Sequence, residues 1–353
     1  MVTVRARCTC GPTEGFRATL IERRDPRPHD VVIDIAFAGI CHSDIDHARS
    51  SRGKTIYPLV PGHEIAGVVA AVGAEVSRFG VGDRVGVGNI VDSCRVCESC
   101  VKGLEQYCSR RVLAYNAIGL DGVRTQGGYS EKIVVDERFV IRIPDSIPLA
   151  NAAPLFCAGI TLYSPLRHWQ AGPGKRVAIL GFGGLGHIGV QIAKALGAHT
   201  TVIELSAAKR EDAERFGAED FRLAGDVSTF NELAGSFDLI ISTIPSTIDL
   251  DAHLSLLSVD GTFVNLSIPQ APLSVGAATL LANRRSLAGT RSGGLPETQE
   301  MIDFCAAHGI QAQVEVISAE AIDDAFERLL AGDVRYRFVI DIRTMGASET
   351  RGS

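Results

Sequence analysis

The sequence predicts an α/β protein that combines a β-rich, barrel-like region with a doubly wound parallel sheet. In the first 150 residues, short β-branched segments such as VVIDIAFA (residues 31–38) and IAGVVAAV (65–72) are separated by turn-forming residues, a pattern typical of strands. From residue 176 onward, strand-like and helix-like segments alternate, beginning with RVAILG and GGLGHIGVQIAKALGA. This alternation indicates a parallel sheet with helices on both faces.

The other elements are expected in chain order. Helical spacing is present at residues 152–169, strands are expected at 200–205, 237–243 and 261–268, and a helix at 209–218. After residue 293 we expect a helix (296–309), a strand (313–318), a second helix (321–333) and a strand (336–342). The polar residues from 344 onward are expected to form a loose tail.

The composition limits the possible partners and the compartment. The 353 residues suffice for two or three domains, and 46% hydrophobic with 22% charged residues excludes a disordered or collagen-like chain. With 35 Lys and Arg against 41 Asp and Glu, the net charge of −6 argues against a nucleic-acid partner. The longest apolar stretch, residues 177–193, is interrupted by polar residues and glycines, and the N-terminus lacks a secretory signal. We therefore expect a cytoplasmic protein with no membrane contact.

A glycine-rich turn at the start of the α/β region predicts a dinucleotide site. The segment fits G-x-G-x-x-G between a strand and a helix, and it consists of Gly181, Phe182, Gly183, Gly184, Leu185 and Gly186. Glycines here let the backbone approach a pyrophosphate, which the helix N-terminus attracts. Glu204 ends the next strand, 18 positions after Gly186, as the dinucleotide fingerprint requires. The alternative is that the glycines serve only helix–strand packing.

Four of the nine cysteines fall within fifteen residues and predict a structural metal site. Cys94, Cys97, Cys100 and Cys108 offer four thiolates, which suits a closed tetrahedral zinc site. An iron–sulfur cluster is the main alternative. The bacterial ferredoxin run, however, places its last cysteine after three spacers and before proline, whereas this loop has seven spacers and Ser109.

A second, dispersed set of residues has the composition of a catalytic zinc site. Cys41, His63 and Cys157 would leave the fourth tetrahedral position open for water or substrate. Spacing alone does not connect these three residues. Taken singly, Cys157 fits an apolar core and His63 fits a hydrogen-bonded histidine.

These motifs resemble the zinc-dependent medium-chain alcohol dehydrogenases, most closely the cinnamyl-alcohol-dehydrogenase-like branch and its bacterial relatives. The likeness extends from about residue 16 to residue 342 and rests on GICHSD, YPLVPGHEIAG, GDRVGVG, LEQYC, TQGGYSE, AAPLFCAGITLYSPL, GFGGLGHIG, PETQEMIDFC and DVRYRFVID. It implies a chaperonin-like β-barrel catalytic domain of residues 1–157 and 294–353. A Rossmann dinucleotide-binding domain of residues 158–293 interrupts it, and the family implies a homodimer.

The resemblance also assigns metal ligands and cofactor contacts. Cys41, His63 and Cys157 would bind a catalytic zinc, with Glu64 as a nearby carboxylate that can replace a ligand, and the four clustered cysteines would hold a second zinc. Cofactor contacts are implied for His42, Ser43, Thr161, Thr243, Thr290, Arg291 and Ser292. Cys8 and Cys10 receive no role.

Proton transfer requires further residues. Ser43 lies two residues after a zinc ligand, where it can take the proton of an alcohol and pass it to the cofactor ribose. The family often ends this relay with a histidine at the position of Asp46, but here histidine follows one residue later, as His47. The relay therefore ends at Asp46, uses His47 or runs through water. Asp44 is expected to orient a ligating imidazole.

The segment after the second strand of the α/β region bears on the choice between NAD and NADP. Glu204 would accept hydrogen bonds from both ribose hydroxyls and repel a 2′-phosphate, whereas Ser206, Lys209 and Arg210 could hold that phosphate. Because we expect the carboxylate to face the ribose and the cations to lie on an exposed turn, we expect NAD, with NADP as the alternative.

We therefore expect a zinc-dependent oxidoreductase that transfers hydride between a nicotinamide cofactor and a primary alcohol or aldehyde. Plant relatives line the substrate pocket with aromatic and apolar residues, whereas this chain has Arg52, Asn89, Leu113 and Arg291 at pocket positions. Added cations and lost aromatic surface favour a polar or anionic substrate over cinnamaldehyde. The alternatives are a reductase of another polarised double bond, such as an iminium, and a catalytically silent member that only binds the cofactor.

Overall fold

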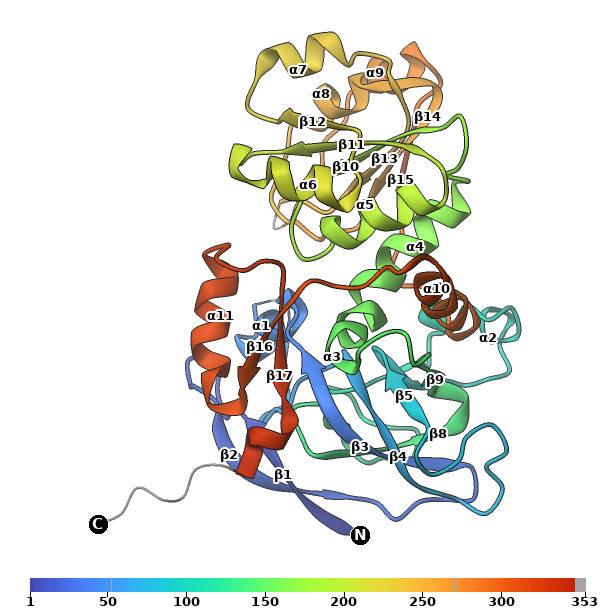
Figure 1. Ribbon diagram of the computed structural model, residues 1–353, viewed down its shortest axis with the longest axis vertical. Coiled ribbons are helices and arrows are strands. Elements are labelled where there is room, and N and C mark those ends of the chain that lie inside the picture. The colour runs from blue at the N-terminus through green and yellow to red at the C-terminus, as the bar shows by residue number, and fades with distance from the viewer. Residues whose placement is uncertain (52, 270, 347–353) are drawn as a thin grey trace. The chain divides into compact units, whose positions relative to one another are not determined.

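The computed structural model describes residues 1–51, 53–269 and 271–346, so the predicted pocket residue Arg52 lies outside the described residues. The chain forms two compact units (Figure 1). One consists of Met1–Cys157 with Gly293–Ser353, and the other of Ala158–Ser292. Each unit has its own sheet and its own hydrophobic core.

The first unit is built on a seven-stranded sheet. Its strand order is β16 (Val314–Ser318), β17 (Arg337–Asp341), β3 (Asp30–Gly39), β4 (Ile65–Val72), β5 (Arg84–Val87) and β9 (Ile141–Arg142), and β8 (Lys132–Asp136) also pairs with β3. Strand β17, near the end of the chain, pairs antiparallel with β3, near its beginning, as the red and blue arrows in Figure 1 show. The C-terminal segment therefore completes the sheet that the N-terminal strands begin.

Shorter elements surround this sheet. Two antiparallel ribbons consist of β1 (Val2–Cys8) with β2 (Arg17–Arg23), and of β6 (Ile90–Asp92) with β7 (Val112–Leu113). The α-helices are α1 (His42–Ala48), α2 (Glu98–Val101), α3 (Leu149–Ala152), α10 (Leu295–His308) and α11 (Ile322–Leu330). Helix α11 buries Ile322, Ala325, Phe326 and Leu329, the i, i+3, i+4, i+7 spacing of one helix face. Residues 344–346 are not part of the predicted loose tail, because Ile342–Gly346 forms a 3₁₀ helix, and the rest of that predicted tail lies outside the described residues.

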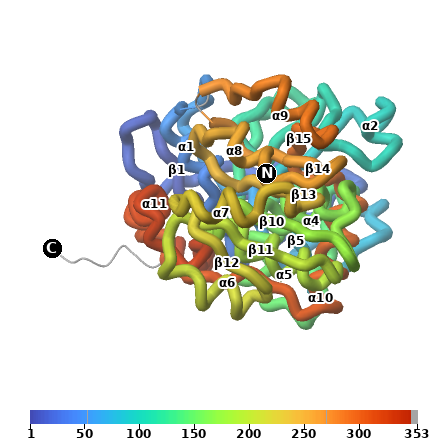
Figure 2. Tube along the Cα trace, turned by 90° about the horizontal axis from the view of Figure 1, so that it is seen from above, coloured from blue at the N-terminus to red at the C-terminus, as the bar shows by residue number. Residues whose placement is uncertain are grey.

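The second unit is the doubly wound parallel sheet that the sequence predicts. Its strands follow the order β12 (Asp220–Leu223), β11 (His199–Glu204), β10 (Arg176–Leu180), β13 (Phe237–Ser242), β14 (Leu257–Asn265) and β15 (Ser286–Gly289), and Figure 2 shows them in this order. Every neighbouring pair is parallel. Counted along the chain, the order is 3-2-1-4-5-6, which is that of the Rossmann fold. The predicted fold class is confirmed.

Helices connect these parallel strands. They are α5 (Gly186–Ala195), α6 (Arg210–Phe216), α7 (Val227–Glu232), α8 (Leu250–Ser255) and α9 (Ala277–Ala282), and α4 (Ala158–His168) precedes the first strand. The central strand β10 is buried along VAIL because a parallel strand covered on both faces has no solvent side. The edge strands β12 and β15 were not predicted, since short and half-exposed segments lack a continuous apolar run.

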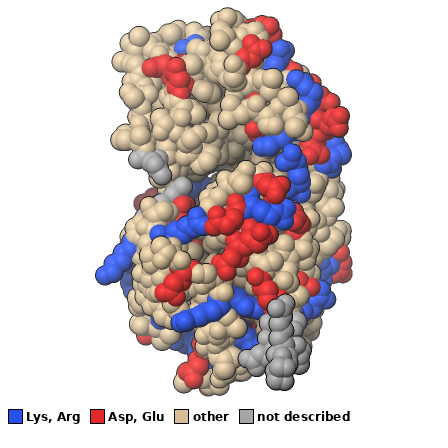
Figure 3. All heavy atoms as spheres, turned by 90° about the vertical axis from the view of Figure 1, so that its left-hand side faces the viewer, with Lys and Arg blue, Asp and Glu red and all other residues tan. Residues whose placement is uncertain are grey.

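Among the described residues, no single helix is both long and apolar enough to cross a membrane. Two successive short segments, Leu149–Phe156 and Ala158–His168, reach that length and composition only when joined across a bend. On the face shown in Figure 3, basic and acidic side chains lie interspersed over much of the surface.

Candidate active site

The first unit brings the dispersed cysteines and histidine of the sequence analysis into one cluster. Ligand atoms of Cys41, His63, Glu64 and Cys157 all lie within 4.8 Å of one another. The Cys41 and Cys157 sulfurs are 3.9 Å apart, and His63 Nε2 lies 3.3 Å from the Cys157 sulfur. In a tetrahedral site with Zn–S of about 2.3 Å and Zn–N of about 2.0 Å, such atoms are about 3.5–3.8 Å apart. The donor set therefore fits zinc.

Strand pairing explains why residues distant in the sequence meet here. The end of β3 lies opposite the start of β4, so Cys41, just after β3, adjoins His63, just before β4. Cys157 follows the 3₁₀ turn Ala153–Phe156, which packs against both strands. Because the sheet assembles the cluster, sequence spacing alone could not connect its members.

Asp44 lies behind the cluster and fixes its geometry. Its fully buried carboxylate accepts hydrogen bonds from the backbone N–H groups of Cys41 (2.9 Å) and Gly62 (3.1 Å) and from the Tyr129 hydroxyl (3.4 Å). His63 Nδ1 lies 3.2 Å from the same carboxylate. A proton on Nδ1 leaves the lone pair of Nε2 directed at the sulfur side, which is the orientation a metal ligand needs. The structure therefore places Asp44 where the sequence analysis expected it.

The pKa values of the three side chains in the cluster shift in different directions. The Cys157 thiol donates toward Cys41, and this contact, with His63 nearby, lowers the pKa of Cys41 well below its usual value. The same contact and burial raise the pKa of Cys157. Burial lowers the pKa of His63, but the Asp44 carboxylate outweighs it and raises that pKa well above normal. A metal ion that binds both sulfurs displaces a proton, so metal affinity rises with pH.

Glu64 and Arg337 form a buried ion pair beside the cluster. Arg337 donates from Nη2 to Glu64 Oε1, and both side chains are almost completely buried. Burial raises the pKa of Glu64 to about 7, against the lowering effect of Arg337. The second oxygen, Oε2, is buried without a hydrogen-bond partner among the described residues. A buried carboxylate oxygen without a hydrogen-bond partner, next to two thiols, is suited to contact a bound cation. Arg337 was not predicted from the sequence, although a charged residue at the start of the strand RFVID was a usable signal.

The clustered cysteines form a second compact donor set. The sulfurs of Cys94, Cys97, Cys100 and Cys108 lie within 4.8 Å of one another. Two pairs, Cys97–Cys100 and Cys108–Cys94, are 3.5 Å apart. Backbone N–H groups of Val96 and Cys97 lower the pKa of Cys94 to about 6. Four sulfurs at these separations leave no open ligand position, as a structural zinc site requires.

Helix α1 carries the predicted proton-relay residues. Ser43 and His42 are exposed, and Asp46 and His47 follow Ser43 by three and four residues, which places all three relay candidates on neighbouring turns of one helix face. Asp46 accepts a hydrogen bond from Ser51 Oγ (2.9 Å), and His47 Nδ1 lies 2.9 Å from Asn116 Nδ2.

The glycine-rich turn of the second unit connects β10 to α5. Gly181 has φ +86°, and a Cβ at Gly186 would lie 2.1 Å from the Gly181 carbonyl oxygen, so both positions require glycine. The Thr243 hydroxyl donates to the carbonyl oxygens of Leu180 (2.9 Å) and Gly181 (3.1 Å). The predicted cofactor residue Thr243 therefore lies against the predicted phosphate loop.

The carboxylate of Glu204 already has hydrogen-bond and ion-pair partners within the protein. Its carboxylate accepts backbone N–H bonds from Phe182 (2.6 Å), Leu205 (2.9 Å) and Ser206 (3.3 Å). Lys209 Nζ lies 3.2 Å from Oε2. From the sequence, Glu204 was expected to face the ribose and Lys209 to lie on an exposed turn, whereas Lys209 is half-buried and paired with Glu204, because the turn after β11 folds back on the carboxylate.

The remaining predicted residues are spread over both units. In the first unit, the Asn89 carbonyl accepts from the Ala114 N–H (2.9 Å), so Asn89 lies beside Leu113, and both are half-buried. In the second unit, Arg210 and Arg291 are exposed, and Thr161, Thr290 and Ser292 are half-buried.

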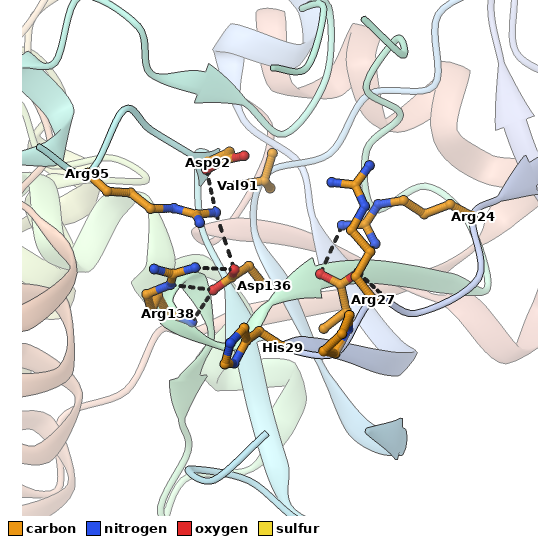
Figure 4. A pocket seen from close by; sticks show the side chains of 10 residues that line it. Arg24, Arg27, His29, Val91, Asp92, Arg95, Asp136 and Arg138 are labelled. Carbon is orange, nitrogen blue, oxygen red and sulfur yellow. Dashed lines mark hydrogen bonds and ion pairs between the residues drawn. The ribbon is translucent and has the colours of Figure 1, made fainter. Parts of the chain in front are cut away.

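A cavity of about 260 Å³ in the first unit belongs to neither metal cluster (Figure 4). Its arginines face carboxylates. Arg138 donates two hydrogen bonds to the Asp136 carboxylate, at 2.7 and 2.8 Å. Arg95 contacts the same carboxylate at 3.2 Å, and Arg24 pairs with Asp30. The lining has one arginine more than it has aspartates, and that arginine, Arg27, pairs with Asp121 at 2.7 Å outside the lining. The ion pairs of Asp136 join β8 to the neighbouring loops.

Comparisons with known proteins agree with this geometry. Residues 27–145 match the family model of the alcohol dehydrogenase GroES-like domain, and residues 184–307 match that of the zinc-binding dehydrogenases. The chain is 57% identical to NADP-dependent alcohol dehydrogenase C of Mycobacterium bovis over 346 residues, which cover 98% of this chain and 100% of the relative.

Solved structures give the same result. A cinnamyl alcohol dehydrogenase of Sorghum bicolor (SbCAD4) superposes with a TM-score of 0.94 at 39% identity, and all of both chains is covered. A Helicobacter pylori protein described as CAD complexed with NADP(H) has a TM-score of 0.91 at 38% identity, with 97% of this chain and 99% of that chain covered.

Proposed function

The chain belongs to the zinc-dependent family of medium-chain alcohol dehydrogenases, and from this premise we propose that it interconverts aldehydes and primary alcohols with a nicotinamide cofactor. The observation that carries the proposal is the complete donor set of Cys41, His63 and Cys157 with Asp44 behind the imidazole. Such a set disfavours the catalytically silent alternative. Reduction of an aldehyde panel by the purified protein, followed as loss of nicotinamide absorbance, tests the proposal. Turnover of cyclic iminium compounds without turnover of aldehydes would contradict it.

In this mechanism Cys41, His63 and Cys157 hold the catalytic zinc. When bound, the zinc supplies a Lewis acid for the substrate oxygen, and the nicotinamide supplies or accepts hydride. Asp44 keeps the His63 proton on Nδ1 and so keeps Nε2 available to the metal. Ser43, exposed on α1, exchanges the proton of the alcohol with solvent, and Asp46 or His47 continues the relay along the same helix.

We propose that the four clustered cysteines hold a structural zinc, so that each chain carries two zinc ions. The close sulfur–sulfur contacts and the backbone N–H bonds that favour thiolate at Cys94 support this assignment. Nine free cysteines in one chain also suit a reducing compartment, which supports a cytoplasmic location.

For the cofactor we propose NADP(H), which departs from the expectation that Glu204 favours NAD. That expectation required a carboxylate free to repel a 2′-phosphate, whereas Glu204 is occupied by three backbone N–H groups and paired with Lys209. Ser206 and the exposed Arg210 supply further donors at the end of β11. The relatives from Mycobacterium bovis and Helicobacter pylori, whose descriptions name NADP, support the same choice.

The ratio of kcat/KM with NADPH to that with NADH tests the cofactor assignment. We expect the ratio to exceed one in the wild type and to fall about tenfold in Lys209→Met, because a cation near the phosphate is removed and Glu204 is left unpaired. Lys175→Met, an exposed lysine of the same unit, is the matched control. A ratio below one in the wild type would restore the NAD expectation.

For the substrate we propose a polar or anionic aldehyde. Asn89 and Leu113, which lie side by side, supply less aromatic surface than the plant relatives, and the exposed Arg291 supplies a guanidinium that matches a carboxylate. Comparing kcat/KM for aldehydes with and without a distal carboxylate, in wild type, Arg291→Ala and the control Arg284→Ala, tests this. A wild-type preference for cinnamaldehyde would contradict this proposal. An unchanged ratio of kcat/KM between the two kinds of aldehyde in Arg291→Ala would also contradict it.

We also propose a homodimer formed through β15. This strand is the last of its sheet in the order of described strands, and Ser286, Leu287 and Gly289 are exposed along it. An exposed edge pairs readily with the same edge of a second copy, which closes a twofold assembly. Light scattering should report a dimer for the wild type and a monomer for Leu287→Pro.

A further inference from the structure

Two cysteines without an assigned role lie at the end of β1. Cys8 is the last residue of that strand, Cys10 follows beyond Thr9, and neither belongs to a metal cluster of the described residues. Thr9 exchanges both backbone hydrogen bonds with Leu59, at 3.0 and 2.8 Å, which keeps the chain extended between the cysteines. Side chains two residues apart on an extended chain point to the same side. The two thiols therefore lie on the same side of the chain.

Cross-strand pairing places a guanidinium beside both thiols. Arg17 is the register partner of Cys8 in the β1–β2 ribbon, and directly opposed residues share a face. Arg17 Nη2 donates to the Cys10 sulfur at 2.7 Å, and its hydrogen bonding to Cys8 raises the pKa of Arg17. A neighbouring positive charge favours the thiolate over the thiol.

The two sulfurs are not equivalent. Cys8 is 2% exposed, and burial together with the neighbouring Cys10 raises its pKa. Cys10 is half-exposed and accepts the Arg17 hydrogen bond. Because Cys10 is the more accessible sulfur and contacts the Arg17 guanidinium, it is the one that can meet an oxidant from solvent, and Cys8 is the buried second thiol.

We propose that Cys8 and Cys10 form a modification site, a dithiol that hydroperoxides convert into an intramolecular disulfide. The Cys10 thiolate attacks one oxygen of hydrogen peroxide, becomes a sulfenic acid and releases hydroxide. The Cys8 sulfur then attacks the Cys10 sulfur, its proton leaves with the sulfenic oxygen as water, and the S–S bond forms. Overall, two thiols lose two protons and two electrons, and one peroxide is reduced to two waters.

The strand geometry permits this closure. Two strand residues span about 6.6 Å, at the upper end of the range of about 4.4–6.8 Å over which disulfides join Cα atoms, and closure also requires the two Cβ atoms to approach to about 3.5–4.5 Å. The bend that begins at Cys10 makes the required adjustment local.

Peptide mass mapping tests the proposal directly. Trypsin cleaves after Arg7 and Arg17, so residues 8–17 form a peptide that contains these two cysteines and no others. The full-length, zinc-loaded protein is treated with hydrogen peroxide, and its remaining thiols are alkylated. We expect this peptide to escape alkylation and to lose the mass of two hydrogens, and dithiothreitol to restore it. Cys305, fully buried in α10, should still be alkylated after unfolding at the same peroxide dose.

Substitutions of Arg17 test whether its charge, rather than the exposure of Cys10 alone, sets the rate of disulfide formation. Arg17→Met should slow disulfide formation about tenfold, Arg17→Lys should retain most of the rate, and Arg5→Met, on β1 with Cys8, should leave it unchanged. In Cys8→Ala, oxidation should stop at a sulfenic acid on Cys10 that dimedone captures.

Two results would overturn the proposal. One is a reduced 8–17 peptide at peroxide doses that already oxidise the clustered cysteines, and the other is equal rates in Arg17→Met and wild type. None of these readouts uses aldehyde turnover, so they are independent of the proposed function.

Discussion

At the scale of single residues, Asp44 connects the segments that hold the proposed zinc ligands Cys41 and His63. It binds the backbone on both sides of the site, at Cys41 and Gly62, and also holds the imidazole of His63. Its carboxylate thus couples the start of α1 to the segment before β4. Removing one acceptor oxygen disturbs two elements at once.

Asp44→Asn should therefore weaken metal binding although it removes none of the proposed metal ligands. The amide keeps the shape but turns an NH₂ group toward N–H donors, and it no longer stabilises the Nδ1 proton of His63. We expect zinc affinity at this site to fall about 10–100-fold and unfolding free energy to fall by about 1–3 kcal/mol. Chelator competition and denaturant titration measure these losses. Asp46→Asn is the matched control, and an equal loss of zinc affinity in that variant would contradict the role given to Asp44.

Asp136 provides a pH-dependent test at the same scale. Hydrogen bonds from Arg138 and the charge of Arg95 outweigh burial and lower the pKa of Asp136. A carboxyl whose folded pKa lies below its unfolded value adds stability above the unfolded pKa and loses it as pH falls through the folded pKa. Asp136→Asn should thus lower stability by about 1 kcal/mol at pH 7.

The difference from wild type should shrink as pH falls below about 4. Urea titrations at several pH values measure it. A difference that is the same at pH 3 and pH 7 would show that the ion pair with Arg138 is not the cause.

At the scale of elements, we propose that the loop of residues 94–108 contributes to the fold by binding zinc. Its regular structure is limited to the single turn of α2 and the 3₁₀ turn Glu105–Tyr107, so side-chain packing alone holds it weakly. The sulfurs instead converge on one point. The loop is therefore expected to depend on zinc for its order.

Cys97→Ser should lower stability while sparing the catalytic cluster. Loss of one of four ligands weakens the structural zinc, and we expect a loss of about 3 kcal/mol, or about 10 °C in Tm. Calorimetry and metal analysis measure both. Ser99→Ala, in the same loop, should behave as wild type. An unchanged Tm in Cys97→Ser with one zinc lost would show that this metal does not stabilise the fold.

The elements that the sequence predicts best are those with a strong pattern. The buried run of β10, the glycine turn and α5 follow from apolar continuity and turn chemistry. Helix α1 was missed because it has seven residues and is organised by its cap, in which Asp44 binds the Cys41 N–H. Edge strands β12 and β15 were missed because exposure removes the apolar signal.

At the scale of the whole molecule, the catalytic cluster depends on contacts between distant segments. Cys41 and Cys157 are 116 residues apart, and Arg337 joins Glu64 across 273. Local patterns contain no information about such pairs, so the residues alone left the cluster as one possibility among several. The family resemblance connected its ligands. Neither source indicated the ion pairs of Arg337 and Lys209, which follow from strand register and turn geometry.

We propose that the cluster at Cys157 holds the zinc on which aldehyde turnover depends. Metal analysis and steady-state kinetics of Cys157→Ser, beside the control Cys305→Ala, test it most directly. We predict two zinc ions per chain in the wild type and the control. In Cys157→Ser we predict one zinc ion, an unchanged circular dichroism spectrum and a loss of turnover of at least about a thousandfold. Turnover near the wild-type rate in a Cys157→Ser protein that retains only one zinc would contradict the account.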